Sequence, residues 1–359
     1  MRPVFISHSG LWSAAGSTPE AVRETLLQRS PTGGRLGVLQ LSFPYAFATE
    51  PLKPFQARLE EGLQAVSASL DLANLAAEAP LLLGSSSLQI GMVEEGAWPP
   101  PQGHVLPQDH LDESIRTFLG LPNTGWTFSS ACTSAVQALD AAIGLIETGA
   151  AEEALVVGVE ILNRTTLSGF ASLQLLSPTA SRPLDLHRDG LMLGEAIAAV
   201  RLSAQPSPWR VHAPALALDA SSATGHATDG STLADVMGRA LVYAETDPKS
   251  LRAIKLQASG SPGADAVEAR ALRRVFGEQL PPVLSLKAAL GHTLGASGLA
   301  EMVALLQAGY LPPTAGFAEP DPELGVEPLE APLAWDSGPI LLNIQGFGGG
   351  LASWVLERR

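Results

Sequence analysis

The sequence is poor in cysteine and in charged residues. Only one of its 359 residues is a cysteine, so no disulfide can form within the chain, and a disulfide-stapled secreted framework is excluded. Charged residues make up 16% of the chain and hydrophobic residues 46%, whereas roughly 25% charged residues is usual for a soluble domain. A chain with so little charge has to bury much of its surface, within itself or against another subunit, and we expect an oligomer.

Basic residues are also scarce, 22 against 36 acidic ones, for a formal charge of −14. The negative field repels phosphate backbones and anionic lipid, so nucleic acid is not an expected partner. No apolar run approaches the roughly 20 residues of a membrane span, and the opening residues lack the core of a signal peptide. We therefore expect a cytoplasmic enzyme or enzyme subunit without a membrane span.

Short aliphatic runs alternate with alanine-rich helical segments, a pattern that predicts an α/β fold with strands covered by helices. In the first half we expect strands at Val4–Ile6, Leu81–Gly84, Leu155–Gly158 and Ala196–Leu202 and helices at Pro19–Leu27, Phe55–Leu70 and Ser134–Thr148. After a breaker at Gln205–Pro208 we expect strands at Val211–Leu218, Ala253–Gln257, Val283–Leu286, Pro339–Asn343 and Ser353–Leu356 and helices at Leu233–Glu245, Ala266–Phe276 and Ala296–Ala308. The two similar series predict a duplicated fold with halves at residues 1–204 and 205–359.

The single cysteine, Cys132, lies where a turn enters a long amphipathic helical run that ends near Gly149. Free backbone N–H groups and the dipole at a helix start lower the pKa of a thiol and offer donors to a developing oxyanion. Free cysteine is also among the most buried residue types, so a structural role is the commoner one for an isolated cysteine. The motifs around Cys132 are therefore needed to distinguish a catalytic role from a structural one.

Four segments, the first of which contains Cys132, favour a catalytic role for this cysteine. In this order they resemble the signature of the β-ketoacyl-carrier-protein synthases. The segments are Gly125–Ala135, Arg182–Glu195, Ser285–Gly298 and Asn343–Gly350. Phe5–Gly10 also resembles the family's first strand and turn, so the resemblance extends over nearly the whole chain. It implies the thiolase-like, duplicated five-layer α/β/α/β/α fold, with a five-stranded sheet in each half.

The resemblance also implies roles for individual residues. In the family a cysteine accepts an acyl chain from a carrier-protein thioester, and two histidines assist decarboxylation of a malonyl extender and stabilise the enolate and the product. Cys132 matches the nucleophile, His292 the second histidine and Lys287 the lysine that orders the site. Phe347 matches the gating phenylalanine, and its N–H and that of Cys132 match the oxyanion hole. The glycines that match the substrate loop are Gly346, Gly348 and Gly349. No cofactor and no metal are implied.

Simpler interpretations exist for some of these residues. A histidine such as His292 can cap a helix start, and a glycine run can be a plain turn. Asp189 and Glu195 match a motif whose role in the family is largely structural, and we assign them no chemistry.

The sequence departs from the family where the first catalytic histidine is expected. Ser259 stands at that position, in a loop about two residues shorter than usual, and upstream Ser222 also replaces a histidine. Losing one strong donor to an enolate costs on the order of 3 kcal/mol, or 10²-fold or more in rate. Loading of Cys132 needs only a thiolate, the helix end and the oxyanion hole, all of which the resemblance retains.

Three functions follow. The favoured one is a chain-length-factor-like partner of a complete ketosynthase, in fatty acid or polyketide biosynthesis, with an acyl-binding Cys132. The others are an active condensing enzyme, in which a group such as His226 replaces the missing histidine, and a non-elongating acyltransferase. A degradative thiolase would need a second cysteine near the C-terminus, and the chain has none.

The implied partners are acyl carrier protein, bearing acyl or malonyl thioesters, and a second subunit in a homodimer or in a heterodimer with a complete ketosynthase. We expect the subunit interface around Asn123–Phe128. Carrier proteins are acidic, so docking one needs a basic patch. The compact candidate is Arg270, Arg273 and Arg274 on one predicted helix, although these arginines equally suit a solvated helix face.

Overall fold

A computed structural model describes residues 2–49, 53–97, 107–122, 125–222 and 225–359. The first half supplies five strands to a large sheet, in the order β1-β8-β6-β4-β5. Strands β4 and β6 are fully or almost fully buried and read as continuous aliphatic runs, as strands covered on both faces do. The strands are β1 (Val4–Ser13), β4 (Leu81–Gly84), β5 (Trp126–Phe128), β6 (Glu153–Glu160) and β8 (Ala196–Ser203).

The second half supplies the other strands of the same sheet, in the order β12-β11-β15-β16, with β10 also paired to β16. These strands are β9 (Trp209–Val211), β10 (Ala215–Leu218), β11 (Ala253–Lys255), β12 (Val283–Leu284), β15 (Gly338–Gln345) and β16 (Gly350–Arg358). Strand β9 is antiparallel to both β1 and β16, so it joins the two halves into one sheet.

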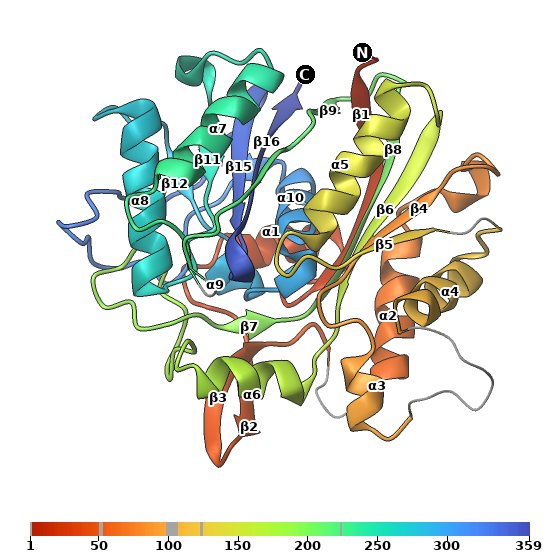
Figure 1. Ribbon diagram of the computed structural model, residues 1–359, viewed down its shortest axis with the longest axis horizontal. Coiled ribbons are helices and arrows are strands. Elements are labelled where there is room, and N and C mark those ends of the chain that lie inside the picture. Colours follow the sequence, from red (N-terminus) through yellow and green to blue (C-terminus); the bar gives the residue numbers. More distant parts are fainter. Residues whose placement is uncertain (1, 50–52, 98–106, 123–124, 223–224) are drawn as a thin grey trace.

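Helices form three layers around these strands (Figure 1). Between the two halves lie α1 (Pro19–Leu26), α5 (Ser134–Glu147) and α10 (Ser297–Ala308); the outer layers hold α2 (Phe55–Ser67), α3 (Ile90–Glu94) and α4 (Pro107–Leu119) on one side, and α7 (Ser231–Tyr243) and α8 (Pro262–Phe276) on the other. Every residue of α10 is buried, as expected for a helix covered on all sides. The expected thiolase-like α/β/α/β/α layering is confirmed, whereas the expectation of a separate five-stranded sheet in each half is wrong, because β9 joins the described strands of both halves into one eleven-stranded sheet.

Smaller elements connect and cover the layered core. They are the strands β2 (Gly34–Val38), β3 (Leu41–Ala46), β7 (Leu193–Gly194), β13 (Tyr310–Leu311) and β14 (Leu333–Ala334), the helices α6 (Arg164–Ser172) and α9 (Lys287–Leu290), and the 3₁₀ turns η1 (Leu72–Asn74), η2 (Pro248–Ser250), η3 (Leu294–Ala296) and η4 (Phe347–Gly349). Strands β2 and β3 pack with α6 in a separate hydrophobic cluster. This cluster includes Leu191 and Leu294, so the cover reaches the Arg182–Glu195 and Ser285–Gly298 segments.

The prediction of a single strand over Val211–Leu218 is wrong. The segment forms two strands, because β9 ends at Val211 and β10 begins at Ala215. Pro214 between them has no N–H to donate to a ladder. The two strands pair with opposite ends of β16. The expected boundary between residues 204 and 205 falls between β8 and β9, and the division into halves there stays a prediction.

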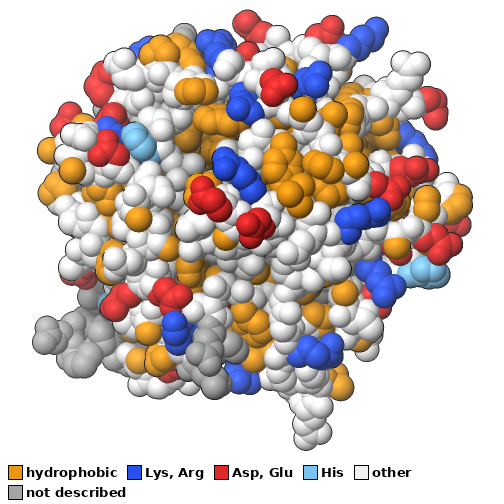
Figure 2. Space-filling view, turned by 180° about the vertical axis from the view of Figure 1, so that it is seen from behind, with side chains coloured by type: hydrophobic (Ala, Val, Ile, Leu, Met, Phe, Trp, Pro, Cys, Tyr) orange, Lys and Arg blue, Asp and Glu red, His pale blue; other side chains and the backbone are white. Residues whose placement is uncertain are grey.

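The surface reflects the low charge content. Figure 2 shows apolar side chains gathered in patches over the upper part of the face turned away in Figure 1, with acidic and basic side chains scattered singly or in small groups. Among the helices that the structure describes, none combines the length and the apolar character needed to cross a membrane. In the same described segments, no group of three or more histidine, cysteine or acidic side chains is arranged to hold a metal.

Candidate active site

Cys132 lies in a tight turn that leads into α5. Ala131 adopts a φ of 51°, in the left-handed region that costs a residue with a Cβ about 1 kcal/mol or more. The Ser134 hydroxyl stabilises this turn, because it accepts a hydrogen bond from the backbone N–H of Ser130 at 2.9 Å and donates one to the carbonyl of Ala131 at 2.6 Å. The turn holds the Cys132 side chain, which is 4% exposed, against the other half of the molecule.

The resting thiol of Cys132 is not acidified, contrary to the expectation from its place before a helix. Burial raises its pKa, and the backbone N–H of Phe347 and the charge of Lys287 only partly oppose that effect. Desolvation of the thiolate therefore outweighs the helix end. The N–H of Phe347 donates toward the sulfur, which is the arrangement expected of an oxyanion hole.

His292 faces the sulfur of Cys132, with its Nε2 3.2 Å from Sγ. Its other ring nitrogen, Nδ1, lies 2.8 Å from the Ser297 hydroxyl and 3.2 Å from Nζ of Lys287. Burial, followed by the charges of Lys287 and Lys255, holds the pKa of His292 well below its usual range, so the ring is neutral. An ammonium can only donate, so Nδ1 accepts and the ring proton sits on Nε2, toward the sulfur.

Lys287 belongs to a buried ionic cluster that the sequence did not predict. Glu301 on α10 makes ion pairs with both Lys287 and Lys255. Lys255, on β11, also donates to the backbone carbonyl of Asn343 at 2.8 Å, and both lysines are fully buried. The cluster holds two basic groups and one acidic group, and the charges of both lysines lower the pKa of His292. The available signal was a lysine inside an aliphatic strand, Ile254–Leu256.

Phe347 begins the short turn η4, directly after Gly346. A Cβ placed on Gly346 would lie 3.5 Å from the backbone nitrogen of Cys132, so the two backbones approach closely. The ring of Phe347 packs against that of Phe170 on α6, with centroids 5.7 Å apart. The predicted gating residue is thus in contact with the cover of the site.

Two glycines shape the rest of this turn. Gly348 and Gly349 have φ values of 77° and 85°. A Cβ on Gly349 would lie 1.9 Å from the carbonyl oxygen of Asp219, whereas one on Gly348 would meet nothing within 4 Å. Neither glycine lines the cavity described next. Their position indicates that they set the course of the loop.

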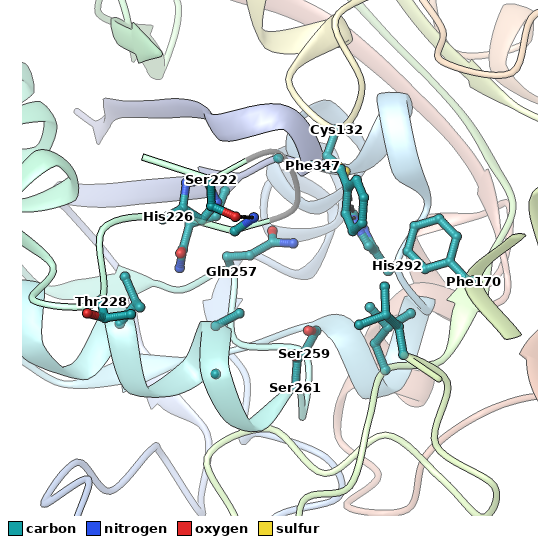
Figure 3. Close-up of a pocket in the computed structure, with 18 residues that line it drawn as sticks. Cys132, Phe170, Ser222, His226, Thr228, Gln257, Ser259, Ser261, His292 and Phe347 are labelled. Carbon is teal, nitrogen blue, oxygen red and sulfur yellow. Dashed lines mark hydrogen bonds between the residues drawn. The ribbon is translucent and has the colours of Figure 1, made fainter. Parts of the chain in front are cut away.

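The site opens into a cavity of about 370 Å³ between the two halves (Figure 3). The predicted residues that line it are Cys132, His292, Ser259, Gly346 and Phe347, and other polar residues on its walls are Ser222, His226, Thr228, Gln257, Ser261 and Gln345. The structure therefore brings the matched cysteine, histidine and gate together with the serine that replaces the first histidine. Lys287 lies behind His292, outside the lining.

Ser259 is held by its backbone. Its N–H donates to Asp265 at 3.0 Å, and its carbonyl accepts from the hydroxyl of Ser181 at 2.8 Å. Glu268, one turn further along α8, accepts from the N–H groups of Gln257 at 2.9 Å and Ala258 at 2.8 Å. These buried carboxylates thus clamp the loop that carries Ser259, and burial raises their pKa values, to about 6 for Asp265 and about 7 for Glu268.

Glu195 is buried and structural. It makes an ion pair with Arg58 on α2 and accepts from the N–H groups of Ala48 at 2.9 Å and Leu162 at 3.2 Å. Asp189 accepts a hydrogen bond from the hydroxyl of Ser177 at 2.5 Å. Neither of the two reaches the cavity.

The remaining candidates lie around the cavity. His226, the possible substitute for the missing histidine, lies across the cavity from Cys132 (Figure 3), and burial lowers its pKa. Each of the three arginines on α8 donates a hydrogen bond to a backbone carbonyl. Arg270 bonds to Thr228, Arg273 to Leu324 and Arg274 to Asp229. In the expected interface segment, Asn123 and Thr124 lie outside the described residues, and Trp126 is 53% exposed on the edge strand β5.

Family models match the chain in two consecutive segments. Residues 114–206 match the N-terminal domain of beta-ketoacyl synthases, and residues 210–318 match their C-terminal domain. The chain belongs to the beta-ketoacyl synthase family. This membership sets aside the degradative thiolase.

Similar curated proteins come from polyketide pathways. The oxytetracycline polyketide putative beta-ketoacyl synthase 1 of Streptomyces rimosus is 33% identical over 251 residues, and the tetracenomycin polyketide synthase ketoacyl synthase alpha subunit of Streptomyces glaucescens is 31% identical. Each alignment covers 64% of this chain and 59% of the relative. The aligned part thus spans well under two thirds of these relatives.

Solved ketosynthases share the fold. The ketosynthase ApeO in complex with its chain length factor ApeC, from Xenorhabdus doucetiae, gives a TM-score of 0.83 at 24% identity and covers 100% of this chain and 98% of the matched chain. The ishigamide ketosynthase/chain length factor gives 0.83 at 22% identity, covering 100% and 99%. At these identities the likeness describes the fold alone.

Proposed function

We propose that the chain is a ketosynthase-like subunit in polyketide or fatty acid biosynthesis that holds acyl chains on Cys132 and acts as a chain-length-factor-like partner of a complete ketosynthase in the cytoplasm. One observation carries this proposal. The groups needed to load an acyl chain surround Cys132, whereas the wall that should carry the first catalytic histidine carries Ser259.

Loading uses groups that are already in place. The Cys132 thiol releases its proton to water, and its sulfur attacks the thioester carbonyl to form a new C–S bond. The new oxyanion accepts hydrogen bonds from the N–H groups of Cys132 and Phe347. The Nε2–H of His292 at 3.2 Å stabilises the thiolate before the attack. When the intermediate collapses, the bond to the carrier sulfur breaks and the departing thiolate takes up the proton that Cys132 released.

Decarboxylative condensation lacks such support. It needs two strong donors for the enolate oxygen, and His292 supplies one of them. The second position holds Ser259, whose shorter side chain sits on a backbone fixed by Asp265 and Ser181. The loop has little freedom to bring a hydroxyl to the place of an imidazole, so the isolated chain is expected to condense poorly.

A second subunit and a carrier protein complete the proposal. Strand β5 ends the sheet with its backbone edge unpaired among the described strands and with Trp126 half exposed, which suits pairing with another subunit. The arginines of α8 adjoin the cavity, because Thr228 lies both beside them and on the cavity wall, and they offer a basic surface to an acidic carrier. Solved relatives include ketosynthases in complex with a chain length factor and with an acyl-carrier protein.

One observation favours the alternative of an active condensing enzyme. His226 lines the cavity, and among the described residues its Nδ1 has no hydrogen-bond partner. If His226 supplied the second donor, the chain would condense on its own. A non-elongating acyltransferase would need Cys132 loading alone.

The test begins with loading. The chain and its Cys132→Ala variant are incubated with acyl-carrier-protein and coenzyme A thioesters, and intact mass is measured. We expect wild type alone to gain the acyl mass. An unmodified wild type would refute the acyl-holding role and leave a structural subunit.

The second arm measures carbon dioxide release from malonyl carrier protein, and gel filtration measures assembly. We expect little release by the chain alone, full release with a histidine-containing ketosynthase, and a complex of the two chains. Rapid condensation by the isolated chain, abolished in His226→Ala, would establish the alternative. A chain that stays monomeric with every ketosynthase tested would exclude the partner role.

A further inference from the structure

Two glutamines occupy the ends of adjacent parallel strands at the cavity. Gln345 is the last residue of β15, and Gln257 lies two residues beyond the end of β11, which is parallel to β15. Both line the cavity and are almost fully buried, with exposed fractions of 5% and 4%. The carboxyl ends of parallel strands are where ligands bind in open α/β sheets.

The backbone of each glutamine is engaged with neighbouring elements, which leaves the side-chain amides to bind a ligand. The N–H of Gln257 donates to Glu268, and Gln345 pairs with Leu351 of β16. Figure 3 shows the Gln257 amide extending into the cavity from below Ser222 toward the side where Cys132 lies.

The amide atoms lack partners within the described part of the chain. These atoms are Oε1 of Gln257 and both Oε1 and Nε2 of Gln345. A buried polar atom without a partner costs about 1–3 kcal/mol, and an aliphatic side chain at either position would avoid that cost. Unsatisfied amide atoms on two residues that line one cavity therefore point to a ligand that supplies their hydrogen bonds.

The chemistry of the unmet atoms restricts that ligand. They are two acceptors and one donor, and exchanging the O and N of the Gln345 amide still leaves that residue with one unmet donor and one unmet acceptor. A saturated acyl chain offers neither, and a ketone can only accept. A hydroxyl group both donates and accepts, so it can bond to both amides at once.

The place of the hydroxyl along the acyl chain follows from Gln345. This residue directly precedes Gly346, whose backbone lies against that of Cys132. A group held by the Gln345 amide is therefore near the thioester end of a chain attached to Cys132.

We propose that Gln257 and Gln345 form a polar subsite for an acyl thioester with a hydroxyl near its thioester end, of which a 3-hydroxyacyl thioester is the simplest. This inference deepens the proposed function, because it rests on the loading of Cys132. It assigns the chain a preference for hydroxylated over saturated acyl groups of equal length.

The experiment compares pantetheine thioesters of butanoate, 3-hydroxybutanoate and 3-oxobutanoate. The initial rate at which each acylates Cys132 is measured by intact-mass analysis. We expect the hydroxylated substrate to react at least tenfold faster than butanoate. In Gln257→Leu and Gln345→Leu the ratio should fall toward one. Gln307→Leu is the matched control, because Gln307 is also buried with an unpartnered Oε1 but lies away from the cavity, and it should keep the wild-type ratio.

Other outcomes overturn the inference. Equal rates for butanoate and 3-hydroxybutanoate in wild type would do so, as would a preference that both leucine variants retain. A third arm uses thioesters of propanethiol, which has no amide groups. If the effect of the leucine variants disappears there, the glutamines bind the amides of the pantetheine arm and the acyl preference is wrong.

Failure of loading is kept separate from failure of the subsite. If no thioester modifies Cys132, the proposed function fails, and binding is measured by calorimetry with the unreactive thioethers S-(3-hydroxybutyl)pantetheine and S-butylpantetheine. Tighter binding of the hydroxylated thioether to wild type, lost in Gln345→Leu, would support the subsite alone. Equal binding would refute it.

Discussion

At the scale of single residues, the most consequential side chain is one that touches no cavity. Lys255 shares Glu301 with Lys287, and this sharing leaves one positive charge of the cluster uncompensated. The charge of Lys255 acts on the titratable groups of His292, Lys287 and Glu268. A buried lysine of this kind helps to lower the pKa of His292 through space, after the larger effects of burial and of Lys287.

We predict that Lys255→Met raises the pKa of His292 toward its usual range. The change removes one of the two positive charges that depress this pKa and leaves the Glu301–Lys287 pair intact. A pH titration of the labelled His292 ring by NMR measures it. Lys249→Met, at an exposed position in η2, is the control. An unchanged His292 midpoint in Lys255→Met would show that the cluster does not control the ring.

At the scale of elements, the turn η4 connects the gate to the oxyanion hole. Its course depends on Gly349, which has no room for a side chain beside the carbonyl of Asp219. The Asp219 carboxylate in turn accepts from the N–H groups of Ser221 and Ala227. The loop from Asp219 to Ala227, which also borders the cavity, therefore fixes the course of η4.

We predict that Gly349→Ala slows acylation of Cys132 by about 10²-fold or more, because the turn has to shift and the N–H of Phe347 leaves the sulfur. Gly348→Ala shares the positive φ but has open space around its Cβ, so only the backbone strain of about 1 kcal/mol applies. Acylation rates by intact mass compare the two. Equal rates in both variants would contradict the role of the close approach.

The elements also show what the sequence can and cannot predict. Helix α5 begins at the expected residue and ends one residue early, because its apolar period and the turn before it are local signals. The β2–β3 hairpin went unpredicted, because Gly37 in β2 and Pro44 in β3 are residue types that usually interrupt strands. Cys132 and His292 were predicted together through family motifs, whereas the partners of Lys255 depend on packing between β11 and α10, which no local pattern encodes.

At the scale of the whole molecule, buried carboxylates make stability depend on pH. Glu268 has a folded pKa of about 7, above its ordinary value of 4.5, because burial opposes its charge. For an acid with a raised pKa, the stabilising contribution is complete below 4.5 and is lost as the pH rises through 7. Asp265, with a pKa of about 6, acts in the same direction.

We predict that Glu268→Gln gains stability relative to wild type as the pH rises from 5 to 8, by roughly 2–3 kcal/mol in the free energy of unfolding. The glutamine stays neutral and can still accept one of the two backbone N–H groups. Urea denaturation at both pH values measures the difference. Glu278→Gln, at an exposed position on the loop after α8, is the control. A difference from wild type that does not vary with pH would refute the prediction.

The way the two halves are joined has a consequence for how the chain folds. Strand β1 pairs with β8 and β9, which are separated from it by most of the first half, so its partners leave the ribosome long after it does. At 5–20 residues per second this delay is on the order of 10 s or more. Until then an apolar strand is without its neighbours and open to aggregation. We therefore expect slow folding, a dependence of soluble yield on chaperones, and poor recovery of either half expressed alone.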